Sequence, residues 1–279
     1  TFYAENARNQ TQADVITHSE PSTMVRLGEE GLLAAFSPDH LDRYPAEAVD
    51  SMKGYAFPDS LAYLVIAYNT DLVTGDDLAF LKADPYAALV DPRFKGQVTF
   101  PDPNVNGTSY NHFYLIGSHR GGWDSPEARA WYEALAANEP MIFNSNGPVA
   151  DAIVSGEAKV GMIVESFAAA QVKKGAPLGI LYPDPTFAMF TATGVVAQAP
   201  HPHAARYFVN WLLSKEGQEA RNLASDIAVA HADVQDQRAY LVEKDWYDPP
   251  ETLYFPPDLL EQDAARTPFL ELFNRLFGT

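Results

Sequence analysis

Apolar residues recur along the chain in two alternating patterns. Short runs rich in β-branched and aromatic residues are typical of strands, and segments with apolar residues three or four positions apart are typical of helices. The runs predict strands at about 13–17, 62–68, 97–100, 159–164 and 194–198. The helical spacing predicts helices at about 22–32, 108–118, 125–137, 148–155, 203–213, 215–223 and 258–276. Alternation of strands and helices in this way indicates an α/β protein.

One segment, Gly194 to Gln218, is more informative than the others. A strand-like run ends before Pro200, because proline has no N–H to donate within a sheet. Pro202 suits the first position of a helix. Ser214 is a candidate cap for a second, shorter helix. The predicted helix between them has one apolar face, formed by Ala205, Phe208, Val209, Leu212 and Leu213.

The order of residues in this segment resembles the C-terminal-domain signature of extracellular solute-binding proteins of ABC importers. That signature is a strand, then Pro-x-x-Ala-Ala-x-x-Phe, then Leu-Leu-Ser-x-Glu-Gly-Gln. Further segments resemble other family motifs in the order that the family requires: Asp14–Glu20, Ile66–Asn69, Asp91–Pro103 followed by Asn106–Ser109, and Gly156–Gly161. The resemblance covers nearly the whole chain and is closest to the branch of ferric-iron, organophosphonate and sugar-phosphate binders.

The resemblance implies a two-lobe type 2 periplasmic-binding-protein fold. Residues 1–65 and 190–279 would form lobe 1, residues 66–189 would form lobe 2, and hinge strands at about 62–69 and 182–193 would connect them. In this family the solute lies in the cleft between the lobes. The family also has a strand and a helix before the segment Asp14–Glu20, so we expect that this N-terminal unit is missing from the chain.

Composition excludes several classes of function. The formal net charge of −18 over 279 residues argues against binding to nucleic acid, whose phosphates attract basic surfaces. No run of 18 apolar residues is present. The absence of cysteine removes thiol nucleophiles and thiolate metal sites. We find no nucleophile elbow, phosphate loop, zinc-protease motif or dinucleotide fingerprint, and therefore expect neither an enzyme nor a cofactor.

Two polar loops before predicted helices are candidates for solute binding in lobe 2. The first holds Asn106, Gly107, Thr108 and Ser109, with Thr108 or Ser109 expected to cap the helix. The second holds Ser145 and Asn146, followed by Gly147 and by Pro148 at the expected first helical position. The start of a helix offers free N–H groups and a partial positive charge, so two such starts favour an anionic ligand. Each of these residues could equally serve only as a helix cap.

The remaining site candidates match ligand-contacting positions of the family. In lobe 1 these are His18, Ser19 and Ser22 after the first strand, and Tyr55, Phe57 and Asp59 before the first crossing. In lobe 2, Glu165 and Ser166 lie in an expected loop after a strand. A carboxylate at that place would suit an amine, a hydroxyl-rich solute or a cation.

These observations predict the solute-binding component of an ABC importer. We expect a periplasmic monomer that captures a small organic anion, such as a phosphonate, phosphate ester or carboxylate, and delivers it to an ABC permease in the inner membrane. A ferric-iron-binding transport protein is one alternative. It is disfavoured because Glu165-Ser-Phe-Ala-Ala169 stands where many iron binders carry adjacent tyrosines, so we expect no metal site. The effector-binding domain of a transcription regulator is a second alternative.

Overall fold

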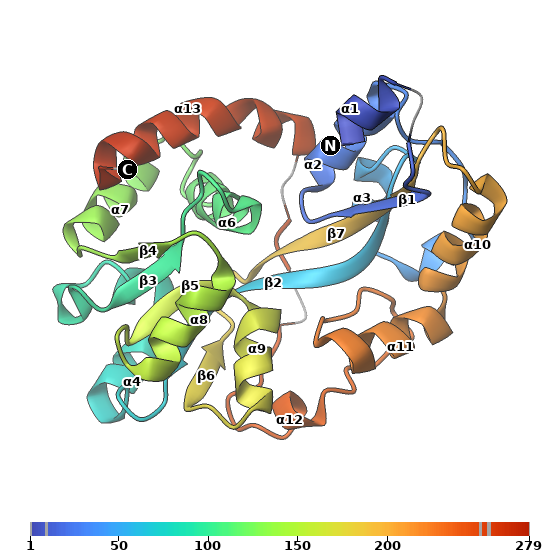
Figure 1. The fold of residues 1–279 in the computed structure, drawn as a ribbon. Coiled ribbons are helices and arrows are strands. Elements are labelled where there is room, and N and C mark those ends of the chain that lie inside the picture. The colour runs from blue at the N-terminus through green and yellow to red at the C-terminus, as the bar shows by residue number, and fades with distance from the viewer. Residues whose placement is uncertain (1, 9–10, 251–252, 256–257, 279) are drawn as a thin grey trace. The chain divides into compact units, whose positions relative to one another are not determined.

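The computed structural model describes residues 2–8, 11–250, 253–255 and 258–278 (Figure 1). The chain forms two compact units. Unit 1 comprises Thr1–Ala62, Met189–Arg238 and Pro257–Asp263, and unit 2 comprises Tyr63–Ala188, Ala239–Pro256 and Ala264–Thr279. The chain leaves unit 1 within strand β2 (Phe57–Asn69) and returns to it within strand β7 (Phe187–Val195).

The units differ from the predicted lobes at the C-terminal part of the chain. We predicted that residues 190–279 would all join lobe 1, but residues 239–256 and 264–279 belong to unit 2. For residues 264–279 the reason is aromatic packing by helix α13 (Leu259–Phe277). Its Phe269 and Phe273 lie against Phe113 of unit 2, with ring centroids 6.2 and 5.5 Å apart.

Unit 1 is built on three neighbouring strands in the order β1, β7, β2. Strand β1 (Val15–His18) runs antiparallel to β7, with Val15 opposite Val195. Its helices are α1 (Phe2–Asn6), α2 (Pro21–Glu29), α3 (Ala46–Ser51), α10 (Pro202–Leu212) and α11 (Lys215–Ser225), with a 3₁₀ turn at Leu41–Arg43. Ala205 and Val209 of α10 pack with Phe57 and Val195 in a buried core. Phe208, predicted on the same apolar face, is instead 46% exposed.

The Ser-x-Glu-Gly-Gln part of the family signature makes the junction of α10 and α11. Ser214 caps α11, accepting a hydrogen bond from the N–H of Gly217 at 3.2 Å. Gly217 has no room for a side chain, since a Cβ atom there would lie 2.1 Å from the carbonyl oxygen of Trp211. The side-chain amide of buried Gln218 donates to the carbonyl oxygens of Asp59 at 2.7 Å and Leu212 at 2.9 Å. The signature therefore anchors a helix junction to strand β2.

Unit 2 is built on strands in the order β2, β5, β3, β4, with β6 also paired to β2. Strands β3 (Val98–Pro101), β4 (Met141–Phe143) and β5 (Val160–Val164) are parallel where β3 pairs with the other two, and β5 and β6 (Leu178–Leu181) run antiparallel to β2. The helices are α4 (Gly75–Ala83), α5 (Pro85–Ala88), α6 (Gly107–Ser118), α7 (Pro126–Ala137), α8 (Asn146–Ser155), α9 (Glu165–Lys173) and α12 (Ala239–Val242), together with α13 and a 3₁₀ turn at Pro92–Phe94.

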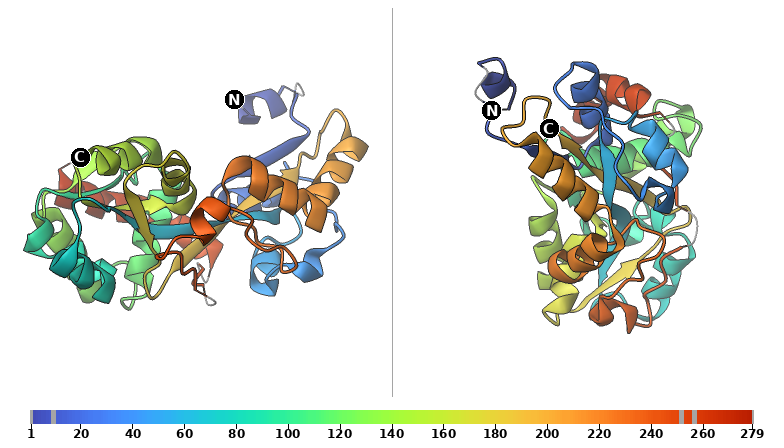
Figure 2. Two further views of the ribbon diagram at one scale, coloured as in Figure 1. Left: turned by 90° about the horizontal axis from the view of Figure 1, so that it is seen from below. Right: turned by 90° about the vertical axis from the view of Figure 1, so that its right-hand side faces the viewer.

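The sheet of unit 2 lies between helices on both faces (Figures 1 and 2). Helices α8 and α9 cover one face, where Val149, Ile153 and Ala168 are buried with Val65 and Ile163 of the strands. On the other face lie α6, α7 and α13, whose aromatic side chains surround Phe113. Since both faces of the strands are covered, every residue of β3 and β5 is buried, and Thr99 is a polar residue in otherwise apolar strands. Within the residues that the structure describes, none of the helices is long and apolar enough to cross a membrane.

Candidate functional site

Three helices of unit 2 begin at one edge of its sheet. Helix α6 follows β3, α8 follows β4, and α9 follows β5. Because these strands are parallel where they pair, their carboxyl ends meet at the same edge. The N-terminal turns of the three helices are therefore neighbours, and their free N–H groups and partial positive charges add at this place.

The first turn of α6 is organised by Asn106. Its backbone is extended, and its side-chain oxygen accepts hydrogen bonds from the N–H of Ser109 at 2.9 Å and the hydroxyl of Thr108 at 2.7 Å. The prediction that Thr108 or Ser109 caps the helix was therefore wrong, because both already lie inside it. The Ser109 hydroxyl donates instead to the carbonyl oxygen of Pro101, at the end of β3.

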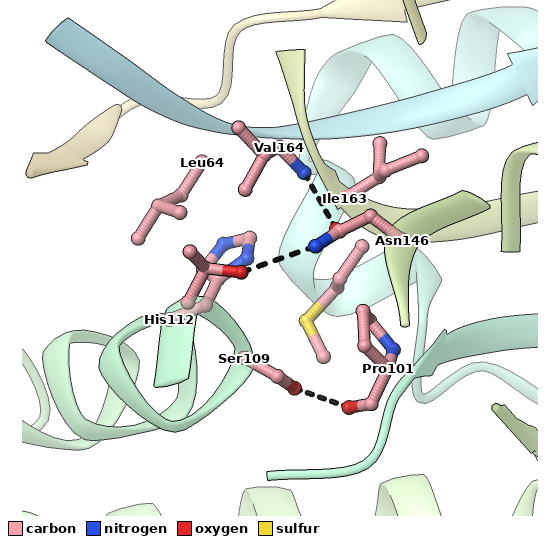
Figure 3. A pocket seen from close by; sticks show the side chains of 9 residues that line it. Leu64, Pro101, Ser109, His112, Asn146, Ile163 and Val164 are labelled. Atoms are coloured by element: carbon pink, nitrogen blue, oxygen red, sulfur yellow. Dashed lines mark hydrogen bonds between the residues drawn. The ribbon is translucent and has the colours of Figure 1, made fainter. Parts of the chain in front are cut away.

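The first turn of α8 is joined to α6 by Asn146. This buried side chain donates from Nδ2 to the Thr108 hydroxyl oxygen at 3.2 Å, and its Oδ1 accepts from the backbone N–H of Val164 at 3.1 Å (Figure 3). Ser145 is the capping residue, is exposed, and makes no side-chain capping bond. Pro148, predicted at the first helical position, is the third residue of α8. Asn146 thus ties together the ends of three elements.

A small pocket opens where these elements meet (Figure 3). Its cavity volume is about 10 Å³, room for about one water molecule. Pockets that bury whole drug-sized ligands have volumes of about 300–1,000 Å³, so this one admits a single small group at most. Its lining residues are Leu64, Pro101, Thr108, Ser109, His112, Asn146, Met162, Ile163 and Val164.

His112 adds an uncharged polar ring to the pocket. Burial lowers its pKa from 6.5 to about 3, so the imidazole is neutral at physiological pH. Its Nε2 lies 3.2 Å from the hydroxyl oxygen of Tyr86. Burial also raises the pKa of Tyr86, whose hydroxyl therefore keeps its proton. The positive potential of the pocket consequently comes from helix starts and N–H groups and not from a histidine cation.

Glu165 stands next to the pocket, directly after Val164. We expected it in a loop, but it is the first residue of α9 and is 1% exposed. The hydroxyl of Tyr182 donates a hydrogen bond to its Oε1. The N-terminal end of a helix also stabilises a carboxylate. Ser166, the next residue, is half-buried on α9.

Three predicted residues of unit 1 lie around the end of β1. His18 is the last residue of the strand and is exposed, and its Nδ1 accepts from the N–H of Glu20 at 3.0 Å. Ser19 is also exposed, whereas Ser22 is buried in the first turn of α2. These positions provide two polar side chains to solvent.

The other three predicted residues of unit 1 are enclosed to different degrees. Tyr55 is half-buried and packs so closely over Gly28 that a Cβ atom there would lie 2.1 Å from its ring. Phe57 is in the core, edge-on to Phe36 with ring centroids 4.9 Å apart. Both Phe57 and Asp59 face the interior of unit 1, so contact with a solute would require this interior to open.

Asp59 belongs to a buried ionic network. Its Oδ2 lies 3.2 Å from Nη1 of Arg221 and accepts a hydrogen bond from the hydroxyl of Thr193, while the Ser60 hydroxyl donates to its Oδ1 at 3.1 Å. Desolvation raises the pKa of Asp59, and Arg221 with the two hydroxyls opposes that rise. The carboxylate is thus compensated within the fold.

Comparison with known proteins identifies the family. A family model described as a bacterial extracellular solute-binding protein matches residues 10–248. The chain belongs to this family. Members of this kind are described as binding proteins rather than enzymes.

Two curated relatives of this solute-binding protein are named after different solutes. Spermidine/putrescine-binding periplasmic protein 1 of Haemophilus influenzae is 26% identical over 196 residues, which cover 69% of this chain and 51% of that protein. A candidate 2-aminoethylphosphonate-binding periplasmic protein of Salmonella typhimurium is 27% identical over 223 residues, covering 76% of this chain and 60% of that protein. The chain thus spans 51–60% of the length of these relatives.

Solved structures confirm the predicted fold class. Iron-bound HitA from Pseudomonas aeruginosa has a TM-score of 0.78 with this solute-binding protein and is 24% identical, with 99% of this chain and 85% of that chain covered. Identity at this level demonstrates a shared two-lobe periplasmic-binding fold and does not assign a solute.

The structure brings together most of the residues predicted in the second lobe. Thr108, Ser109 and Asn146 line one pocket, and Asn106 accepts hydrogen bonds from the first two. Glu165 directly follows Val164, another lining residue. Sequence analysis missed His112, although it lies four residues after Thr108 and therefore on the same face of α6. It also missed the N–H of Val164, which no side-chain pattern reveals because it belongs to the backbone.

Proposed function

We propose that this protein is the solute-binding component of an ABC importer and that it captures a small organic anion. The observation that supports this most directly is the hydrogen bond between Asn146 and Thr108, which joins the first turns of α8 and α6 at one pocket. Two helix starts directed to one place form a preorganised site for an anionic oxygen atom. The candidate groups are a phosphonate, a phosphate ester or a carboxylate.

The energetics favour a solute with an organic body. A helix terminus contributes about 0.3–1 kcal/mol to anion binding, and up to about 2 kcal/mol when partly buried. Micromolar affinity requires about 8 kcal/mol. The head group in the pocket therefore supplies part of the affinity, and burial of the remainder of the solute supplies the rest. The two-lobe closure expected from the family would provide such burial and stays a prediction.

A periplasmic location for this protein agrees with the names of the relatives, which describe periplasmic binding proteins. Its monomeric state and its delivery of the solute to a permease in the inner membrane are part of the proposal. The 2-aminoethylphosphonate of the second relative is an organic anion of the proposed class. Ferric ion and a regulatory effector remain the alternatives that an experiment must separate from it.

A thermal-shift and calorimetry screen tests the proposal. The ligands would be ethylphosphonate, a sugar phosphate, a carboxylate and ferric ion. Thr108→Leu places an apolar side chain in the pocket, and we expect it to abolish binding of the preferred anion while circular dichroism stays unchanged. Thr74→Leu is the matched control, since Thr74 is an exposed capping residue at the start of α4 in the same unit. Unchanged affinity in Thr108→Leu, or a coloured complex with ferric ion alone, would contradict the anion proposal.

A further inference from the structure

The hydroxyl protons at the pocket of Thr108 and Asn146 are already used within the fold. The Thr108 hydroxyl donates to Oδ1 of Asn106 at 2.7 Å, and the Ser109 hydroxyl donates to the carbonyl oxygen of Pro101. A hydroxyl group has one proton to donate, so neither group can bind an incoming oxygen atom in this way without breaking its present bond. A solute that enters this pocket therefore depends on other donors.

His112 is a lining side chain with an unused ring nitrogen. It is 2% exposed and borders the pocket (Figure 3), and its Nε2 lies 3.2 Å from the hydroxyl oxygen of Tyr86. Its second ring nitrogen, Nδ1, has no hydrogen-bond partner among the residues that the structure describes. Buried polar atoms are nearly always hydrogen-bonded. Because Nε2 is turned to Tyr86 and the ring borders the pocket, Nδ1 is the atom of this side chain left to a ligand.

Tyr86 fixes which nitrogen of His112 carries the proton. The Tyr86 side chain is buried, and its hydroxyl keeps its proton because burial raises its pKa. Within the described part of the chain, Nε2 of His112 is the atom placed to accept that proton. A neutral imidazole has one N–H group and one acceptor nitrogen. With Nε2 as the acceptor, the proton lies on Nδ1, whereas the opposite tautomer would leave the buried hydroxyl without an acceptor.

The size of the pocket limits what can reach Nδ1–H. Its volume of about 10 Å³ has room for about one water-sized group. A neutral N–H forms a charge-assisted hydrogen bond with an anionic oxygen, roughly twice as strong as a neutral one, and it cannot accept a proton from a ligand. The helix starts at this place also favour negative charge. One deprotonated oxygen atom of a carboxylate or phosphoryl group therefore fits both the space and the donor.

We propose that His112 is a specificity-determining residue of this pocket, where its Nδ1–H, held in this tautomer by Tyr86, donates to one deprotonated oxygen of the solute. Tyr86 is then a positioning residue, since it acts through the imidazole. This inference rests on the proposed function, because it assumes that the anionic group of the solute enters the pocket at Thr108 and Asn146.

Nitrogen NMR spectroscopy tests the tautomer without any ligand. In protein that carries isotopically labelled histidine, each ring nitrogen reports whether it bears a proton, and His112→Phe identifies the His112 signals by their loss. We expect the proton on Nδ1 in the wild-type protein and a mixture of both tautomers in Tyr86→Phe, which keeps the ring and removes the hydroxyl. Tyr207→Phe, at a 78% exposed tyrosine, is the matched control and should leave the signals unchanged. A proton on Nε2 in the wild-type protein would overturn the inference, whatever the protein binds.

Calorimetric titration with ethylphosphonate and with propionate tests the donation to the solute. Asparagine can place an amide N–H close to the position of Nδ1, whereas phenylalanine keeps a ring and has no donor. We therefore expect His112→Phe to weaken the binding of the tighter anion at least about tenfold, and His112→Asn to weaken it less. His203→Phe, at an exposed histidine, is the matched control and should bind like the wild-type protein.

The outcomes separate this inference from the function on which it rests. If His112→Phe binds ethylphosphonate and propionate as tightly as the wild-type protein does, the imidazole serves packing or a bound water only, and the inference is wrong while the anion proposal stands. Binding of neither anion by the wild-type protein would overturn the proposed function and the donation that depends on it, and the NMR result would still decide the tautomer.

Discussion

The side-chain amide of Asn146 lies 3.2 Å from the hydroxyl oxygen of Thr108, so that the first turn of one helix holds the first turn of another. The same amide accepts from the N–H of Val164, so this one side chain joins α8 to α6 and to the end of β5 at the pocket. Its loss should disorganise the pocket more than the loss of any one hydroxyl.

We therefore predict that Asn146→Ala lowers affinity for the anionic solute about tenfold or more, as expected when a buried polar site loses one partner and leaves others unpaired. The measurement is calorimetric titration with ethylphosphonate. Asn144→Ala is the control, because Asn144 is exposed just before α8. If the two variants bind equally well, Asn146 does not organise the site.

His112 should make stability depend on pH. Its pKa is about 3 in the folded protein and 6.5 as the ordinary value. Between these values the unfolded chain binds a proton that the folded protein does not. The stabilising contribution is therefore complete above pH 6.5 and is lost as pH falls towards 3, at about 1.4 kcal/mol per pH unit.

Urea unfolding between pH 5 and 7, a window chosen above the ordinary carboxylate pKa values of about 4, tests this prediction. His112→Gln removes the titrating ring, so the free energy of unfolding of the variant should vary less with pH in this window. The difference between the two curves is the quantity to compare. Parallel curves would mean that His112 is protonated in the folded protein or exposed to solvent.

Because Asp59 and Arg221 form a buried ion pair, we predict that removing one charge destabilises the protein more than removing both. Arg221→Met leaves a fully buried carboxylate without its cation, and this should cost about 3–5 kcal/mol of unfolding free energy. Asp59→Asn together with Arg221→Met removes both charges and should cost less than Arg221→Met alone. Chemical denaturation of the two single variants and the double variant measures the coupling. Additive costs would show that the two side chains do not interact.

Two glycine substitutions should have opposite effects. Gly217→Ala brings a Cβ atom against the carbonyl oxygen of Trp211, and overpacking of this kind costs about 1–3 kcal/mol. Gly147→Ala, in the first turn of α8, meets no atom within 4 Å and should be neutral or stabilising by up to about 1 kcal/mol. Thermal unfolding of both variants checks the pair, and a harmless Gly217→Ala would refute the close approach at the helix junction.

Sequence patterns predicted the helices with strong periodicity and missed the short or mixed ones. The prediction at 203–213 matches α10 within one residue at each end, because its apolar face is continuous. Helix α9 was not predicted, since Glu165-Ser166 resembles a polar loop and its cap, Val164, carries no capping side chain. Strand β7 was predicted at 194–198 but spans Phe187–Val195. The threonines of β7 interrupt the run of apolar residues by which a buried strand is recognised in a sequence. Thr193 is nevertheless buried, and its hydroxyl donates a hydrogen bond to Asp59.

The candidate site was predictable where loops carry polar residues before helices. This pattern predicted four residues of the site: Asn106, Thr108, Ser109 and Asn146. It did not predict that Asn106, and not Thr108, caps the helix, because only the folded backbone shows which residue is extended. The ring contacts of Tyr182, whose hydroxyl donates to Glu165, could not be found in this way. Tyr63, Tyr182 and Tyr247 come from distant parts of the chain, and only tertiary packing brings their rings together.

The junction at Ser214, Gly217 and Gln218 has a consequence for classifying related sequences. These residues are required by a crowded turn and by a hydrogen bond to the backbone of β2, and none of them lines the pocket at Thr108 and Asn146. A motif maintained by such geometry can persist in proteins that import quite different compounds. To group homologues by the solute they bind, one should therefore compare the positions equivalent to Thr108, Asn146 and Glu165. The segment equivalent to Ser214–Gln218, although it is the easiest to recognise, does not distinguish solutes.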